Sequence, residues 1–178
     1  MPNDPRPRRR SLRLSAYDYY QEGACFITVC TQNRGMLFGK VIDCDVQLNG
    51  MGMIVRQAWD DLPTHYHGID LDAFIVMPNQ VQGIINLADQ PEQPSALPEI
   101  MRGGFKTFSP RRVNERAGKR GAMWQRGYYE HVIRNEKALA RIRAYIAHNP
   151  VRWADDPENI SRAASAERRA GLKPAPTS

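Results

Sequence analysis

Apolar residues along the chain fall into short runs that are separated by turn-forming residues. The segments 24–31 and 81–87 are rich in β-branched residues, and the segment 69–77 alternates between polar and apolar positions before it becomes continuously apolar. Runs of this length, bounded by Gly, Pro and Asn, are typical of strands. The pattern also predicts a short hairpin between residues 36 and 47 and a further strand over residues 124–133.

The segment after the predicted hairpin has apolar residues at helical spacing. Asn49 is a favourable N-cap residue, and the helix after it is expected to run to about Leu62, where Pro63 ends it. Apolar positions three or four residues apart give this helix a buried stripe. The predicted stripe consists of Met53, Ile54, Gln57, Ala58 and Leu62.

The segment from Leu97 to about Arg116 is basic and amphipathic, and it is also predicted to be helical. Two dipeptides, Gly103-Gly104 and Ser109-Pro110, disfavour a single straight helix there. The expected apolar anchors of this segment are Ile100, Phe105, Phe108 and Val113.

A last helix is predicted over about residues 136–148, with Asn135 as its N-cap. Pro150 disfavours helical backbone angles in the residue before it, so this helix is expected to stop near Asn149. Its predicted apolar stripe consists of Leu139, Ile142 and Ile146.

The resulting order of elements is β-α-β-β-α-β-α, in which the two middle strands form a hairpin. This order predicts an α+β fold of the split βαβ type, an antiparallel sheet with helices on one face and an open second face, completed by a C-terminal helix. One domain is expected over residues 15–153. A basic flexible arm over residues 1–14 precedes it, and a disordered tail over residues 154–178 follows it.

The charge of the chain is strongly positive, because its 178 residues carry a formal net charge of +6 and a pI of about 9.5. Five arginines lie between Arg6 and Arg13, and seven Lys or Arg residues lie between Arg102 and Arg120. Such clusters favour a polyanionic partner such as nucleic acid. A solvated helix face with a solubilising tail gives the same pattern.

Two further features bear on where the protein works. No apolar run reaches the roughly 20 residues that a membrane span needs, and no secretory signal opens the chain. The three cysteines lack a C-x-x-C pair, so reduced and mostly buried thiols are expected. Together these features predict a cytoplasmic protein.

Gln80 and Gln82 stand two residues apart at the start of a predicted strand, directly after a Pro-Asn corner. Side chains at this spacing point to the same face of a sheet. Their carbonyl oxygens assist a hard cation such as Mg²⁺ but make poor dedicated ligands. A pair of hydrogen-bonded amides on a sheet face is the simpler interpretation.

The last predicted helix carries Tyr145 beside its apolar stripe, with Arg141 one turn before it and His148 and Asn149 one turn after it. A phenol, a guanidinium and an amide therefore share one surface. A core aromatic with a polar tip, followed by a C-terminal cap at Asn149, is the alternative.

Two other stretches are candidate sites. The segment 124–131 alternates aromatic, basic and polar residues, which suits either a stacking platform for single-stranded bases or a strand with one face in the core. His65 and His67 form a His-x-His pair, but no recognised ligand spacing surrounds them, and a solvated loop is favoured over a metal site.

Several segments of the chain, taken in order, resemble one family. They are Arg8–Leu14 with Tyr17-Asp18-Tyr19, Cys25–Thr31, Arg34 with Leu37-Phe38-Gly39, Phe74–Asn79, Phe105-Lys106, Trp124–Glu136, and Tyr145-Ile146 with Asn149-Pro150. Over roughly residues 8–155 the chain resembles the IS200-like single-tyrosine transposases of the HUH endonuclease class. Within that class, the resemblance is to the branch associated with repetitive extragenic palindromes (REP).

This resemblance implies a ferredoxin-like fold and a site that joins a metal-binding pair on a strand to a tyrosine on the last helix. In the family, Mg²⁺ or Mn²⁺ polarises a phosphodiester of single-stranded DNA, and the tyrosine attacks it to form a 5′-phosphotyrosine link. Tyr145 matches the position of the nucleophile, and Asn149 matches that of a third, amide-type metal ligand. The implied partner is single-stranded DNA with hairpins or palindromic repeats, bound by a monomer or a homodimer in the bacterial nucleoid.

The chain departs from the family at the metal-binding pair. Gln80-Val81-Gln82-Gly83 stands where the family has His-hydrophobic-His-Gly, so both ligand positions carry neutral amides. Impaired DNA nicking and joining is therefore expected, because amides hold Mg²⁺ or Mn²⁺ poorly. A non-catalytic hairpin-binding protein, decayed or domesticated, is the alternative. An RNA-binding module with the same sheet topology is a weaker one, since the first strand offers only Phe26 for stacking.

The predicted DNA contacts are basic residues of the N-terminal arm, the basic helix and the last third of the chain. They are Arg8, Arg9, Arg10, Arg13, Arg102, Lys106, Arg111, Arg112, Arg126, Arg134 and Arg141.

Overall fold

The computed structural model describes residues 23–88, 96–118 and 120–155. The predicted arm over residues 1–14 and all but the first two residues of the predicted tail over 154–178 lie outside these ranges. The strands are β1 (Gly23–Cys30), β2 (Gly39–Ile42), β3 (Asp45–Leu48), β4 (Ile69–Met77), β5 (Gln80–Leu87) and β6 (Tyr129–Ile133). The helices are α1 (Gly50–Asp60), α2 (Leu62–His65), α3 (Lys106–Ala117) and α4 (Glu136–Arg152). A π-helical stretch, Glu99–Phe105, leads into α3, and short 3₁₀ turns lie at Gln32–Arg34 and Trp153–Asp155.

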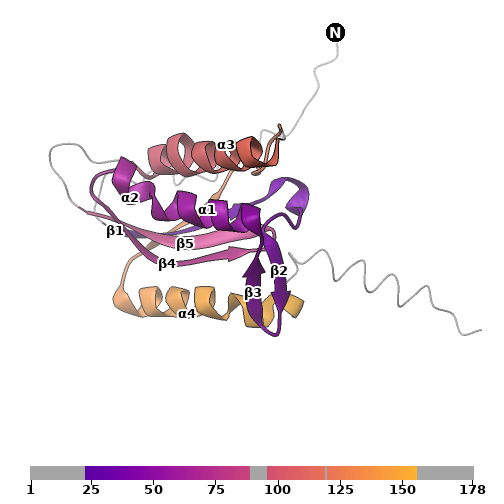
Figure 1. Ribbon diagram of the computed structural model, residues 1–178. Helices are drawn as coiled ribbons and strands as arrows, with labels where there is room; N and C mark the ends of the chain where they lie inside the picture. The colour runs from indigo at the N-terminus through magenta and orange to yellow at the C-terminus, as the bar shows by residue number, and fades with distance from the viewer. Residues whose placement is uncertain (1–22, 89–95, 119, 156–178) are drawn as a thin grey trace, which may run out of the picture.

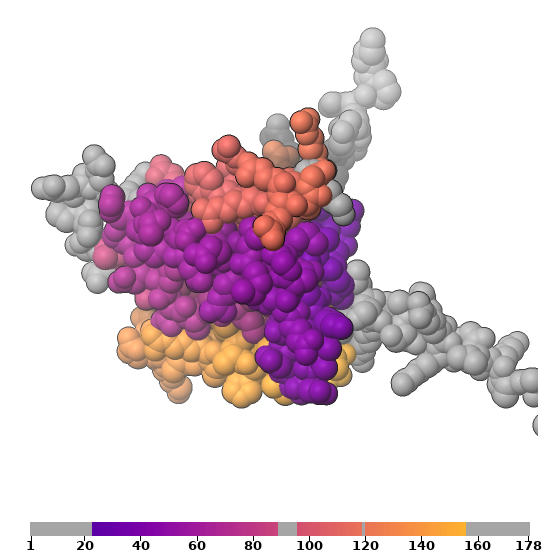
Figure 2. Space-filling model, viewed as in Figure 1, coloured from indigo at the N-terminus to yellow at the C-terminus, as the bar shows by residue number. Residues whose placement is uncertain are grey.

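The described residues form an antiparallel four-stranded sheet in the order β4-β5-β1-β6, beside a small β2-β3 hairpin. Helices α1 and α3 lie together on one face of the sheet, and α4 lies across the other (Figure 1). In the space-filling view, α4 forms a separate lower layer, and the β2-β3 hairpin reaches down to it (Figure 2). The predicted α+β fold is confirmed. The sequence predicted that the second face of the sheet is open, but in the structure α4 covers this face.

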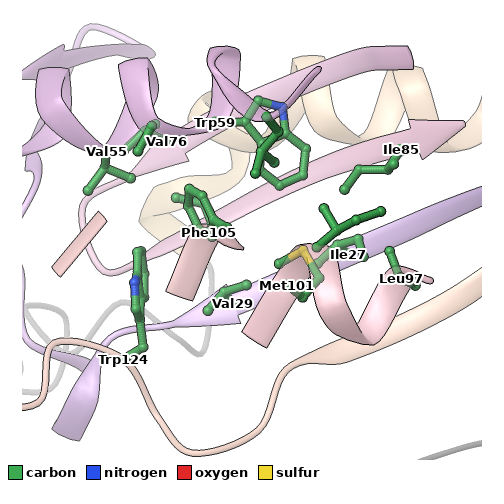
Figure 3. Close-up of a cluster of buried hydrophobic side chains, with 14 of the residues drawn as sticks. Ile27, Val29, Val55, Trp59, Val76, Ile85, Leu97, Met101, Phe105 and Trp124 are labelled. Carbon is green, nitrogen blue, oxygen red and sulfur yellow. The ribbon is translucent and has the colours of Figure 1, made fainter. Parts of the chain in front are cut away.

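Alternation along the strands produces two apolar clusters, one on each face of the sheet. On β1, Cys25, Ile27 and Val29 point toward α1 and α3, whereas Phe26 points toward α4. The larger cluster also holds Trp59 of α1 and other large side chains that Figure 3 draws. The smaller cluster consists of Phe26, Ile84, Ile133 and Ile146, with half-buried neighbours from α4. The sheet therefore has a large core on one face and a thinner apolar layer under α4.

The predicted stripe of α1 is only partly correct, because Ala58 and Leu62 are buried whereas Met53 and Gln57 are exposed. Asn49 does cap the helix, because its side chain accepts from the backbone N–H groups of Met51 and Gly52. The buried positions are Gly52, Val55, Ala58 and Trp59, whereas Met53 is 59% exposed. Tertiary packing sets this buried face. Trp59 stacks on Phe74 at 4.4 Å between ring centroids and covers Gly83, where a Cβ would lie 2.5 Å from the indole ring.

The basic segment is interrupted as predicted, by the π-helical stretch that precedes α3. Phe108 is not a buried anchor, since it is 36% exposed, and Ser109 is buried in its place. The Ser109 hydroxyl accepts a 2.9 Å hydrogen bond from the indole N–H of Trp124 and donates to the Phe105 carbonyl. This hydrogen bond holds the Trp124 side chain in the core. The Trp124 backbone forms only an isolated bridge with Thr31, so the predicted strand over 124–133 narrows to Tyr129–Ile133.

Helix α4 continues past the predicted stop near Asn149 and ends at Arg152, with Pro150 inside it. A proline in a helix removes one N–H donor and crowds the preceding turn, which usually ends the helix. Here the turn is held from outside, because Ile146, Asn149 and Pro150 are all buried against the sheet. Asn149 therefore keeps a helical position instead of forming a C-terminal cap.

Candidate functional site

The two glutamines of β5 face α4. Gln80 lies opposite Cys30 of β1, and Gln82 lies opposite Thr28, so these four side chains point from the same face of the sheet. Both glutamines are 3% exposed. Their amides are thus buried polar groups at the centre of the sheet, where hydrogen-bond partners are needed.

Tyr145 and Asn149 lie one turn apart on the face of α4 that meets these glutamines. Asn149 is 3% exposed, and its Nδ2 donates to Gln82 Oε1 over 2.6 Å. Gln82 Nε2 lies 3.5 Å from the Tyr145 hydroxyl oxygen and donates toward it. The structure therefore brings together the strand pair and the helix pair that the sequence singled out separately. Tyr145 is 42% exposed beside the buried amides.

These residues line a pocket of about 570 Å³ between the sheet and α4. Its lining residues are Phe26, Thr28, Cys30, Gln80, Gln82, Tyr129, Tyr145, Asn149, Arg152 and Asp155. The Phe26 ring makes edge-to-face contacts with Tyr129 at 6.3 Å and with Tyr145 at 6.1 Å between centroids. The pocket thus has an amide floor and an aromatic side.

An ion pair ties α4 to the edge of the sheet near Tyr145. Arg143 donates from Nε to both carboxylate oxygens of Asp72 at 3.0 Å, and from Nη2 to Oδ2 at 2.6 Å. Asp72 lies at the irregularity in the β4-β5 pairing between Leu71 and Phe74. The hydrogen bond from Arg143 lowers the pKa of the Asp72 carboxyl below its ordinary value of 3.8. This two-pronged contact fixes how α4, and with it Tyr145, lies on the sheet.

The pocket residues do not fit a dedicated Mg²⁺ or Mn²⁺ site. Gln82 Oε1 is already taken by Asn149, and Gln80 Oε1 accepts a weak 3.8 Å contact from the Cys30 thiol. Such cations are normally held by carboxylates, with imidazole also suiting the transition metals. Among the described pocket residues the only carboxylate is Asp155, and no group of three or more His, Cys, Asp or Glu in the described chain could hold a metal.

The predicted DNA contacts divide between the two faces of the molecule. Arg8, Arg9, Arg10 and Arg13 lie outside the described residues. Arg102, Arg111 and Arg112 belong to the helical layer on the face opposite α4 (Figure 1). Two of these pair with carboxylates, Arg111 with Glu115 at 3.0 Å and Arg112 with Asp61 at 2.5 Å.

Three other predicted contacts lie outside that helical layer. Arg126 is exposed in the loop before β6, Arg134 is exposed between β6 and α4, and Arg141 is exposed on α4. Arg141 lines a second hollow of about 580 Å³ that also includes Tyr145, His148 and Arg152. The α4 side therefore carries positive charge on the same helix as the tyrosine.

Lys106 makes contacts within the protein that the sequence did not predict. Its ammonium donates to three successive carbonyls, those of Gln125 at 2.7 Å, Arg126 at 2.9 Å and Gly127 at 2.8 Å. An ammonium group has three N–H donors, so this loop engages all of them. Burial, with a smaller contribution from Arg102, lowers the pKa of Lys106 to about 8. Lys106 holds the loop before β6 in place and leaves no donor for a phosphate.

Several pocket residues were not predicted as site residues from the sequence. They are Thr28 and Cys30 of β1, and Arg152 and Asp155 at the end of α4 and just beyond it, whereas Phe26 and Tyr129 belong to segments that were considered for stacking. The signal that could have found the β1 residues is the strand register, since each lies on the face that carries Gln80 and Gln82. Arg152 was hidden because the helix was expected to stop before it.

Comparisons with known proteins give consistent results. No family model matches the chain. A protein of uncharacterized function from Haemophilus influenzae is 38% identical over 164 residues, which cover 83% of this chain and 91% of the relative. A protein of the same organism that carries the provisional name REP-associated tyrosine transposase is 23% identical over 140 residues, 76% of this chain and 74% of that one.

Among solved structures, that of a REP-associated tyrosine transposase bound to a REP hairpin superposes with a TM-score of 0.56. It covers 85% of this chain and 87% of its own chain at 21% identity, which shows a common fold. In the part of this chain that the structure describes, no helix is long and apolar enough to cross a membrane.

Proposed function

We propose that the chain is a member of the REP-associated tyrosine transposases, to which it is similar in sequence and fold, and that it binds hairpin-forming single-stranded DNA on the side that carries α4. Because the chain has Gln80 and Gln82 at the two ligand positions, nicking and joining of DNA at Tyr145 is lost or strongly weakened. The protein then acts as a hairpin-binding member of a transposase family.

The observation that carries this proposal is the hydrogen-bonded set of Asn149, Gln82 and Tyr145. A phenol becomes an effective nucleophile when a base takes its proton or a cation favours its charge. Gln82 Nε2 donates toward the Tyr145 oxygen at 3.5 Å, so this amide cannot accept the phenolic proton. The carbonyl that replaces the family's histidine nitrogen is occupied by Asn149. If Tyr145 is the residue that corresponds to the family's nucleophile, as we propose, neither neighbouring amide can activate it by accepting its proton.

Support for DNA binding comes from charge and from the relative of known structure. The net charge of +6 favours a polyanion, and Arg134, Arg141 and Arg152 are exposed beside or within the α4 layer. Arginine positions phosphate through fixed, paired N–H donors. The structurally similar transposase was solved with a REP hairpin bound. A hairpin with single-stranded flanks is accordingly the partner that we propose for this chain.

A second candidate function is residual strand nicking. The observation that favours it is the 42% exposure of Tyr145, whose hydroxyl opens onto the pocket together with Arg152. A buried structural tyrosine would not need this access. The two candidates differ in one measurable product, a covalent link between Tyr145 and DNA.

The test measures binding and covalent linkage in the same preparation. A palindromic hairpin with single-stranded flanks is compared with a scrambled strand of equal length, over a range of salt concentrations. Hairpin-selective binding that weakens steeply with salt is expected, because phosphate contacts release counterions. Equal affinity for hairpin and scrambled DNA would overturn the binding proposal.

Denaturing gels in the presence of Mn²⁺ then report covalent adducts. We expect none from the natural chain. An adduct that disappears in Tyr145→Phe would establish nicking and replace the first candidate with the second. Tyr66→Phe removes a phenol hydroxyl on the opposite face of the sheet and serves as the matched control variant. Ser109→Ala also removes a hydroxyl, but it is not suitable as a control because it removes a core contact.

A further inference from the structure

The pocket under α4 combines features that suit a planar, hydrogen-bonding ligand better than a cation. We propose that it binds one unstacked nucleobase from the single-stranded flank of a DNA hairpin. The buried amides read the edge of the base, and the exposed tyrosine rings contact its face. This inference rests on the proposed DNA-binding function and assigns the pocket a ligand within it.

The floor of the pocket has the hydrogen-bonding groups that base edges require. An amide offers a carbonyl acceptor and an NH₂ group with two donors, which is why Asn and Gln pair in a bidentate manner with bases. Gln80, Gln82 and Asn149 contribute three such amides, each 3% exposed, and the Thr28 hydroxyl lies beside them in the lining. A neutral histidine also has one donor and one acceptor, but they lie at separate positions of the ring, whereas an amide presents both along one edge.

The orientation of the central amide is fixed before any ligand arrives. Asn149 donates to Gln82 Oε1 at 2.6 Å, which directs Gln82 Nε2 toward Tyr145 and the pocket. A buried amide held in this way loses little side-chain entropy when it binds. It also discriminates strongly, because a ligand without the complementary acceptor leaves a buried donor unpaired.

The side of the pocket supplies aromatic surface. Tyr129 of β6 and Tyr145 of α4 both contact the Phe26 ring edge-on, and as whole residues they are 51% and 42% exposed. Exposed aromatic rings are the usual platform for bases of single-stranded nucleic acid. Arg152, in the same lining, is placed to contact the phosphate of the bound nucleotide. The volume of about 570 Å³ is in the range of about 300–1,000 Å³ that small-ligand pockets occupy.

The test uses hairpins whose flank carries the fluorescent adenine analogue 2-aminopurine at each position in turn. One flank position is expected to show strong quenching on binding, because the base stacks on a tyrosine. Natural bases at that position should differ in affinity by roughly fivefold or more, because a base without the complementary acceptor leaves the buried Gln82 donor unpaired.

Substitutions test the amide floor and the aromatic side of the pocket separately. Gln82→Leu keeps the size of the side chain but removes its polar atoms, and it should reduce the difference between bases to less than about twofold while the salt dependence of hairpin binding stays the same. Gln57→Leu, at an exposed position of α1, is the matched control and should leave discrimination intact. Tyr129→Leu, at a largely exposed position, tests the side even if Gln82→Leu folds poorly, and it should lower the quenching.

A separate titration with 2-aminopurine deoxyriboside, followed by NMR of the side-chain amides, distinguishes failure of this inference from failure of the DNA-binding proposal. Shifts at Gln82 and Asn149 without any hairpin selectivity would retain the base pocket and overturn the function proposed above. Hairpin binding in which no flank position discriminates bases, and in which Tyr129→Leu leaves fluorescence unchanged, would overturn the base pocket alone.

Discussion

Asn149 Nδ2 donates to Gln82 Oε1 over 2.6 Å, which joins the C-terminal helix to a central strand across 67 positions of sequence. Both side chains are almost fully buried. The bond satisfies two polar groups that would otherwise be desolvated without partners, and it fixes which face of α4 meets the sheet. The position of Tyr145, one turn earlier on that face, follows from it.

The first prediction concerns the stability that this bond provides. Asn149→Ala leaves the buried Gln82 carbonyl without its partner and should lower the free energy of unfolding by about 1–3 kcal/mol, measured by urea denaturation. Asn114→Ala is the control, because Asn114 makes a longer 3.3 Å bond at an exposed site. Its effect should stay within about 0.5 kcal/mol. Equal decreases in the free energy of unfolding of the two variants would show that the Asn149 hydrogen bond contributes no more than an exposed one.

The second prediction concerns metal binding. The double substitution Gln80→His and Gln82→His supplies two imidazoles on one face of β5 and should create Mn²⁺ affinity that the natural chain lacks. At a metal concentration of 100 times Kd, binding stabilises a folded protein by about 2.7 kcal/mol. The melting temperature of the double variant should therefore rise with added Mn²⁺, while that of the natural chain stays constant. A Mn²⁺-dependent rise in the natural chain would contradict the conclusion that its amides do not fit the ion.

The third prediction concerns acid stability. Because Arg143 lowers the pKa of Asp72 in the folded protein, the carboxylate contributes its full stabilisation above the ordinary value of 3.8. That contribution disappears as the pH falls through the lowered value. The free energy of unfolding should consequently decline more steeply below about pH 4 in the natural chain than in Asp72→Asn, as urea titrations at several pH values would show.

Arg143→Gln tests the cause of this pH dependence. It removes the largest cause of the lowered Asp72 pKa while the hydrogen bonds from Ala73 and Asn86 remain, so it should reduce part of the acid slope, and the double variant should show no reduction beyond that of Asp72→Asn. Additive slopes in the double variant would mean that the two residues act independently.

The fourth prediction concerns Lys106. Lys106→Met keeps the aliphatic stem but removes the donors to three carbonyls of residues 125–127. These carbonyls lie near solvent, so the loss should be only about 1 kcal/mol. The local effect should be larger, with faster hydrogen exchange in the loop before β6. Lys137→Met, at an exposed position at the start of α4, should change neither quantity; faster exchange there as well would show that loss of charge alone loosens the protein.

The sequence by itself determined most of the elements of this protein and their order, although it did not predict α2, which has Pro63 in its first turn. Local signals were sufficient for this, since apolar runs marked β4 and β5, and Asn49 and Asn135 marked the starts of α1 and α4 with side chains that do cap them. The order of strands and helices then restricted the topology to an antiparallel split βαβ sheet. The amide pair Gln80 and Gln82 was visible for the same reason, because alternation on a strand is a local property.

The features of this protein that depend on long-range packing were decided only by the tertiary structure. The buried face of α1 is set by the packing of Trp59 over Gly83, and α4 continues through Pro150 because this part of the helix is buried against the sheet. The role of Lys106 depends on three carbonyl groups that lie about twenty positions away in the sequence. None of these contacts has a signature within one turn or one strand. The meeting of Gln82, Tyr145 and Asn149 in one pocket is of the same kind, because it depends on a helix that closes the open face of the sheet.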